Sequence, residues 1–194
     1  MQQNIKIEII RSNRKTLSIE IRPNDTVLVR APYSMKDRDI YKFLDEKEHW
    51  ITEHLRKAKE RQKESEKIPK LTMDEVKQLA DQATKVIPEK VRHFAEMMGV
   101  KYGRITIRNQ KTRWGSCSGK GNLNFNCLLM LVPEEVMDYV VVHELCHLIE
   151  MNHSKAFWNQ VENVMPDYKI HKQWLKEHGN EIMCRMFLWR EKVQ

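Results

Sequence analysis

The stretch that decides the fold is Val140–Trp158, which reads VVVHELCHLIEMNHSKAFW. It contains the pattern H-E-x-x-H, formed by His143, Glu144 and His147, and His153 follows six residues after the second histidine. Residues four apart in a helix lie one turn apart on the same face. The two histidines of the pattern can therefore direct their imidazole nitrogens at one cation.

The place of Glu144 in the pattern favours a proton acceptor over a ligand. It lies about 100° round the helix from the first histidine, at the edge of the ligand face. There it can take a proton from a water molecule activated by the metal. A catalytic zinc ion needs three protein ligands and one open position, and the nearest third ligand is His153. We therefore predict a catalytic Zn²⁺ site with ligands His143, His147 and His153.

His153 can join this site only if the helix ends before it. In an unbroken helix it would lie about 15 Å along the axis from His143, because each residue rises about 1.5 Å. We predict that the helix ends between Leu148 and Asn152 and that the chain then turns back. Asn152 suits the turn because asparagine tolerates the left-handed conformation. Ser154 is expected to cap a new helix.

The flanks of the pattern indicate a buried helix and not two histidines on an exposed face. The helix is apolar nearly all round, with apolar side chains at Val140, Val141, Val142, Leu145, Leu148 and Ile149. Such a helix is typical of a protein interior. Two histidines and a glutamate buried there need partners, which a shared metal ion supplies.

These residues and their context resemble a known family. The matching segments are Arg113–Cys117 (RWGSC), Leu123–Asn126 (LNFN) with Leu128, Pro133, Asp138–Leu148 (DYVVVHELCHL), and Asn152–Ser154 (NHS) with Phe157 and Trp158. They resemble the YgjP-like metal-dependent hydrolases, which are related to the SprT-like and other zincin metallopeptidases. The resemblance implies an α+β, zincin-like fold in which the active-site helix lies under a small antiparallel or mixed sheet. It also implies a zinc ion on the three histidines and Glu144 as general base.

Composition changes along the chain predict two parts. Apolar residues alternate with polar ones between residues 5 and 31, which predicts a three-stranded antiparallel meander. A helix with Ser34 as N-cap follows. Apolar residues stop after Leu55, and Arg56–Lys67 is nearly all charged or Gln. We therefore expect an N-terminal lobe of meander and helix at residues 1–67, and a zincin-like metallopeptidase domain at residues 68–194.

The second part opens with a strong helix signal. Thr72 and Glu75 form a capping box, and Gly99 is expected to end the helix that follows. Near the other end of the chain, Gly179 is expected to close a further helix.

Two short strands flank a loop ahead of the metal-site helix. They are Arg104–Arg108 and the strand at residues 123–127, and the loop spans Arg113–Gly119. In zincins, an edge strand above the helix pairs with extended substrate, and the resemblance assigns this role to the second strand or its neighbour. Asn124 and Asn126 then contact substrate, or alternatively they tie down the loop. Arg113 and Trp114 are expected to have structural roles, or alternatively Arg113 lies near the site and binds substrate.

Charge and hydropathy indicate the expected location of the protein and the partners it can bind. No run of eighteen apolar residues occurs, so the sequence predicts no membrane span. Met1–Ile10 lacks the apolar stretch and cleavage site of a signal peptide, so we expect a cytoplasmic protein. The net charge is +7, and Lys101–Pro133 contains no Asp or Glu. A nucleic-acid partner is therefore permitted.

The sequence therefore predicts a zinc metallopeptidase acting on a peptide or protein substrate. One alternative is a nucleic-acid-associated protein whose zinc protease acts on DNA- or RNA-bound proteins. The other alternative is a non-catalytic module with a structural zinc ion. Structural sites usually fill all four positions with protein ligands, and three histidines leave that set incomplete.

Overall fold

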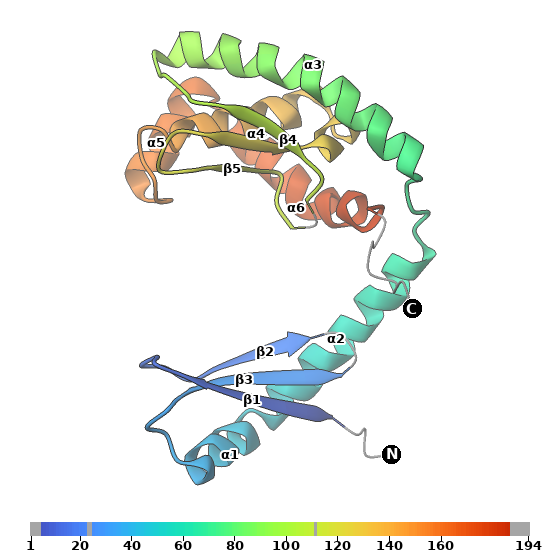
Figure 1. Ribbon diagram of the computed structural model, residues 1–194, viewed down its shortest axis with the longest axis vertical. Helices are drawn as coiled ribbons and strands as arrows, with labels where there is room; N and C mark the ends of the chain where they lie inside the picture. The colour runs from blue at the N-terminus through green and yellow to red at the C-terminus, as the bar shows by residue number, and fades with distance from the viewer. Residues whose placement is uncertain (1–4, 23–24, 111, 187–194) are drawn as a thin grey trace. The chain divides into compact units, whose positions relative to one another are not determined.

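The computed structural model describes residues 5–22, 25–110 and 112–186 of the 194-residue chain (Figure 1). The chain divides into two compact units, Met1–Lys67 and Ile68–Gln194. Each unit combines helices with a three-stranded sheet, so the fold is α+β. Within the described ranges, no helix is both long enough and apolar enough to cross a membrane.

The sheet of the first unit differs from the predicted meander. Its strands are β1 (Lys6–Ser12), β2 (Ser18–Arg22) and β3 (Thr26–Pro32). Their order is β1-β3-β2, with β1 parallel and β2 antiparallel to β3, so the meander prediction is wrong. The reason lies in β3, where Val27, Leu28 and Val29 are consecutive and buried. A strand buried on both faces takes the centre of a sheet, and the more exposed β1 and β2 form its edges.

Two helices, and not one, complete the first unit: α1 (Asp37–Glu46) and α2 (Glu48–Lys67). The predicted cap at Ser34 is absent, because α1 begins at Asp37 after Lys36, which makes no side-chain cap. Both helices bury apolar residues in one core with the sheet, namely Ile40, Leu44, Ile51 and Leu55. The charged segment at residues 56–67 is the exposed end of α2.

The second unit contains the metal-site motif. Its elements are α3 (Met73–Met98), β4 (Ile105–Arg108), β5 (Gly115–Cys117), β6 (Leu123–Asn126), the 3₁₀ helix η1 (Cys127–Leu131), α4 (Glu134–Cys146), α5 (Lys155–Val164) and α6 (Tyr168–Cys184). The sheet has the order β4-β6-β5, with β4 parallel and β5 antiparallel to β6. Helix α3 runs along one side of this unit, and α4 lies behind the sheet in the view of Figure 1. Phe125, Leu145 and Phe157 are fully buried in the core.

The predicted boundaries of α3 are confirmed. Thr72 Oγ1 accepts a hydrogen bond from the Glu75 amide at 3.2 Å, and Glu75 Oε2 accepts one from the Thr72 amide at 2.7 Å. Gly99 ends the helix in the left-handed conformation, with φ of 65°. The capping box and the glycine therefore define this helix as the sequence predicts.

Helix α6 does not end at Gly179, contrary to the prediction, and continues to Cys184. Gly179 is buried, and a Cβ atom there would lie 3.3 Å from Cζ2 and Nε1 of Trp114. The glycine therefore allows close packing of an indole ring against the helix and has no role as a terminator.

Candidate metal centre

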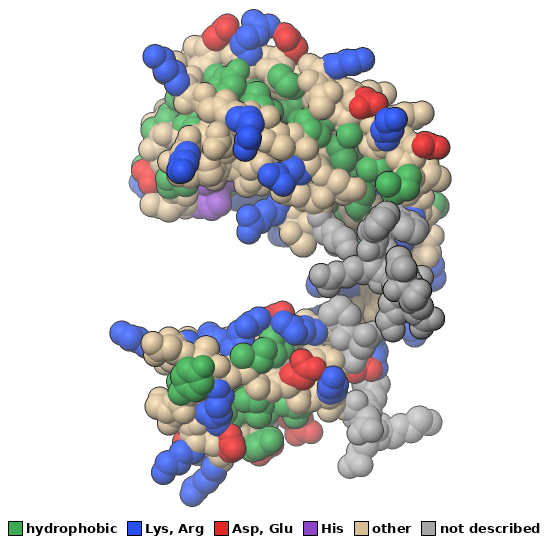
Figure 2. Space-filling view, in the orientation of Figure 1, with side chains coloured by type: hydrophobic (Ala, Val, Ile, Leu, Met, Phe, Trp, Pro, Cys, Tyr) green, Lys and Arg blue, Asp and Glu red, His purple; other side chains and the backbone are tan. Residues whose placement is uncertain are grey.

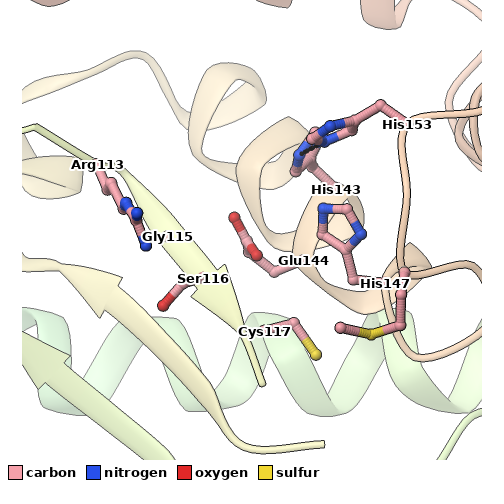
Figure 3. Close-up of a pocket in the computed structure, with 9 residues that line it drawn as sticks. Arg113, Gly115, Ser116, Cys117, His143, Glu144, His147 and His153 are labelled. Carbon is pink, nitrogen blue, oxygen red and sulfur yellow. Dashed lines mark hydrogen bonds between the residues drawn. The ribbon is translucent and has the colours of Figure 1, made fainter. Parts of the chain in front are cut away.

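Three histidines converge in the second unit, as predicted from the motif (Figure 3). The ring centroids of His143, His147 and His153 lie 4.8 to 5.0 Å from one another. One ligand nitrogen from each lies within 4.8 Å of the other two, and Nε2 of His143 lies 3.0 Å from Nε2 of His153. Residues ten positions apart in sequence thus share one site.

The chain reverses between the second and third histidines. Helix α4 ends at Cys146, a little earlier than predicted, and His147 is its C-cap residue. The next turn tightens, because the amides of Leu148 and Ile149 donate to the carbonyls of Leu145 and Cys146, both at 3.0 Å. Such three-residue turns are common at the ends of α-helices.

The turn itself is built differently from the prediction. Among the described residues, Asp25 is the non-glycine residue with positive φ, so Asn152 is not left-handed. Instead, Asn152 Oδ1 accepts a hydrogen bond from the Ser154 amide at 3.0 Å. Ser154 Oγ then accepts one from the Phe157 amide at 3.3 Å and caps α5, as predicted. An asparagine side chain that bonds the backbone two residues later is a common turn device.

The three imidazoles suit a divalent metal ion. His147 Nδ1 lies 3.1 Å from the carbonyl oxygen of Glu150, so this nitrogen carries the proton and donates it, leaving a lone pair on Nε2. Burial, with the neighbouring His147 and His153, lowers the pKa of His143 to about 3, and burial also lowers the pKa of His153. Neutral imidazole is the form that binds metal. The residues therefore fit the metal that the motif predicts.

Aromatic side chains hold the three rings in place. The Phe157 ring is fully buried, and its centroid lies 4.9, 4.5 and 4.8 Å from those of His143, His147 and His153. Trp158 stacks on His153 with the centroids 5.7 Å apart. Because α5 begins just after His153, Phe157 and Trp158 in this helix can pack against the histidine rings.

Glu144 lies beside the histidines in a tight environment. Its side chain is only 6% exposed, and burial raises the pKa of its carboxyl to about 8. The Arg113 guanidinium and the Cys117 backbone act in the opposite direction on this pKa. A Cβ atom on Gly115 would lie 2.7 Å from Cγ and from Oε1 of Glu144. Strand β5 can therefore approach the carboxylate this closely only because residue 115 is glycine.

A cavity of about 220 Å³ joins these groups. The three histidines and Glu144 form one side of it, and Arg113 with β5 forms another (Figure 3). Residues of β5 thus belong to the site, although the sequence placed them in a loop. The signal available for finding them was the resemblance of RWGSC, because a strand of three residues shows too little alternation to be detected.

Of the three residues predicted to contact substrate, only one lines this cavity. Arg113 lines it. Asn126 is 0% exposed, its Nδ2 donating to the carbonyls of Gln110 at 2.6 Å and Arg113 at 2.9 Å, and its Oδ1 accepting from the Leu128 amide at 3.1 Å. The prediction of substrate contact is therefore wrong for Asn126, which instead holds the loop in place.

The side chain of Asn124 also makes structural hydrogen bonds. Its Oδ1 accepts from Arg108 Nε at 3.0 Å, and its Nδ2 donates to Ser116 Oγ at 3.2 Å, so it connects β4 and β5 across β6. Strand β6 is the centre of the sheet, and β5 is the edge strand that contacts α4. The strand at residues 123–126 therefore has no free edge within the described sheet, whereas β4 and β5 are both edge strands.

Comparisons with known proteins identify a family for the chain. A family model described as YgjP-like, metallopeptidase domain, matches residues 15–78 and 73–178. Among solved structures, the metallopeptidase zymogen of Pyrococcus abyssi abylysin is 26% identical over 47% of this chain and 94% of its own, with a TM-score of 0.43. The zymogen of Methanocaldococcus jannaschii jannalysin is 23% identical over 48% and 94%, with a TM-score of 0.42. None of the curated proteins matches.

The family match spans most of the chain and both units. It includes the whole metal centre, from Arg113 to Trp158. A family of metallopeptidases implies a divalent metal ion, and the three converging histidines are the residues that can hold it. The chain belongs to the YgjP-like family and contains its metallopeptidase domain.

Proposed function

We propose that this chain is a zinc-dependent peptidase that cleaves peptide bonds with Glu144 as general base. One observation supports this most strongly: three converging imidazoles and a buried carboxylate line the same cavity. Among the described residues, the cluster of possible ligands contains these three histidines and no fourth side chain. A structural zinc site would usually have four protein ligands, so the arrangement favours catalysis.

The chemistry requires a metal and a base acting together. When bound, a zinc ion polarises the substrate carbonyl and lowers the pKa of water to about 7. Glu144 Oε accepts the proton of the attacking water and later delivers it to the leaving nitrogen. The close approach of β5 at Gly115 leaves little space on that side of the carboxylate.

Arg113 is the best-placed group to stabilise negative charge on the carbonyl oxygen. Tyr139 and Tyr168 are less suited to this role, because both are at most 6% exposed and they stack on each other. Arg113 is exposed, lines the cavity, and acts electrostatically on Glu144. A positive charge near the developing oxyanion lowers the barrier of acyl transfer. We assign the edge of β5 to backbone pairing with an extended substrate.

The test is hydrolysis of an unstructured peptide or casein by the purified, zinc-loaded chain. Wild type should cleave it, and Glu144→Gln should retain zinc and lose turnover. The control is Glu135→Gln, which changes an exposed carboxylate on the same helix and should retain full activity. Full activity of Glu144→Gln would refute the role of general base.

A basic surface favours a second candidate, a peptidase that acts on proteins bound to nucleic acid. Arg104, Arg108 and Lys120 are exposed in the segment without acidic residues. Figure 2 shows Lys and Arg side chains over the part of this unit that carries β4 and β5. If nucleic acid binds here, the affinity should fall steeply as salt concentration rises, and Arg104→Gln should reduce the slope. Binding that is independent of salt would contradict this candidate.

A further inference from the structure

A second cavity of about 240 Å³ lies next to the metal cavity. The two share four lining residues, Arg113, Gly115, His143 and Glu144. Glu144 therefore stands on a wall common to both, so a group in the second cavity lies beside the carboxylate that handles the proton. The other walls come from the segment before β5, from α4 and from α6.

The walls of this second cavity are firmly held. Trp114 packs against Gly179, where a Cβ atom would lie 3.3 Å from the indole. Leu175 lies four residues before Gly179 on α6 and so shares its face, which directs it to the same cavity. On the α4 side, the Tyr139 ring stacks with Tyr168 at 6.4 Å. These contacts restrict the movement of the Trp114 and Tyr139 rings.

The lining combines large apolar surfaces with the polar side chains of Thr112 and His143 and two charged groups. Its large surfaces are the side chains of Trp114, Tyr139, Val140 and Leu175. Arg113 and Glu144 are the charged side chains of the lining, and Arg113 is exposed. The Tyr139 side chain is buried and carries no formal charge. An apolar side chain entering here leaves water for an apolar surface, whereas a charged side chain would lose hydration.

We propose that this second cavity is a subsite for a large apolar substrate side chain, such as leucine or phenylalanine, next to the scissile bond. The inference rests on the proposed function, because the shared wall contains Glu144. It assigns substrate selection to Leu175 and Thr112, which line the subsite but do not line the metal cavity.

The test uses peptides of glycine and serine that contain one variable residue, which is leucine, phenylalanine, alanine or aspartate. Mass spectrometry identifies the bond cleaved, and kcat/KM is measured for each peptide. We expect wild type to cleave next to leucine or phenylalanine at least roughly tenfold faster than next to alanine or aspartate. Equal rates for all four peptides would overturn the subsite.

Two variants fill the cavity from different segments of the chain, so that a folding failure in one still leaves the other to test. Leu175→Phe adds bulk from α6, and Thr112→Phe adds it from the segment before β5. Each should lose the preference for large apolar residues while still cleaving the alanine peptide. Ile170→Phe is the control, because Ile170 is an exposed α6 residue outside the lining. A preference unchanged in both folded filling variants would overturn the proposal.

A binding experiment separates the subsite from the proposed peptidase activity. Fluorescence anisotropy measures the affinity of labelled leucine and alanine peptides for zinc-loaded Glu144→Gln. Tighter binding of the leucine peptide, reduced by Leu175→Phe, supports the subsite even if wild type cleaves no peptide. Cleavage by wild type without any preference in rate or binding would leave the peptidase function intact and refute the subsite.

Discussion

Replacing Gly115 with alanine tests how strictly the site positions its general base. The added Cβ atom would lie 2.7 Å from Cγ and Oε1 of Glu144, and 2.9 Å from its Cδ. Ordinary contact begins near 3.4 Å, so the carboxylate must move by roughly 0.7 Å or β5 must retreat by that distance. A displacement of about 1 Å in a catalytic group can cost about a hundredfold in rate, which corresponds to about 2.7 kcal/mol in the barrier.

The assay compares Gly115→Ala with Gly119→Ala, in which the new Cβ meets nothing within 4 Å. We expect kcat to fall about a hundredfold in the first variant and to remain unchanged in the second. Zinc content should be normal in both, because the three histidines are untouched. Full activity of Gly115→Ala, or an equal loss in Gly119→Ala, would refute the argument that this glycine positions the base.

Three further predictions follow from the same contacts. Arg113→Gln should lower kcat by about tenfold or more while the zinc content stays normal. Arg113→Lys, which keeps the positive charge, should retain part of the lost kcat. An effect on KM alone would exclude a role in charge stabilisation. Thr72→Ala removes the cap of α3 and should lower the free energy of unfolding by about 1 kcal/mol in urea denaturation, with activity retained at low urea. Asn126→Ala should cost on the order of 2 kcal/mol of stability, because three backbone groups lose their partner. A stable Asn126→Ala protein with a raised KM would instead indicate substrate contact.

The metal centre was largely predictable because its geometry follows from spacing. His143 and His147 occupy one helix face, so a third ligand at His153 required the helix to end, and it does. The serine cap of α5 followed from the same requirement. The way in which the turn forms could not be predicted, because Asn152 can promote a turn through its backbone conformation or through a side-chain hydrogen bond. Sequence alone does not distinguish these.

The errors arise where long-range contacts decide the local structure. Gly179 resembles a helix terminator, but its role is set by Trp114, which lies 65 residues earlier in the chain. Strand order in the first unit is likewise decided by which strand is buried on both faces, and the consecutive apolar residues of β3 carried that information. Asn126 has a polar side chain of the kind that often binds substrates. Its hydrogen-bond partners, however, are backbone carbonyls of a loop.

Metal analysis of the purified chain, with and without the substitution His153→Ala, tests the central claim most directly. The site predicts about one zinc ion per wild-type chain and a large loss of zinc in the variant, whose fold should be retained because His153 is exposed. His178→Ala, which removes an exposed histidine outside the cluster, should bind zinc like wild type. Undiminished zinc affinity in His153→Ala would contradict the assignment of three histidines to one catalytic ion.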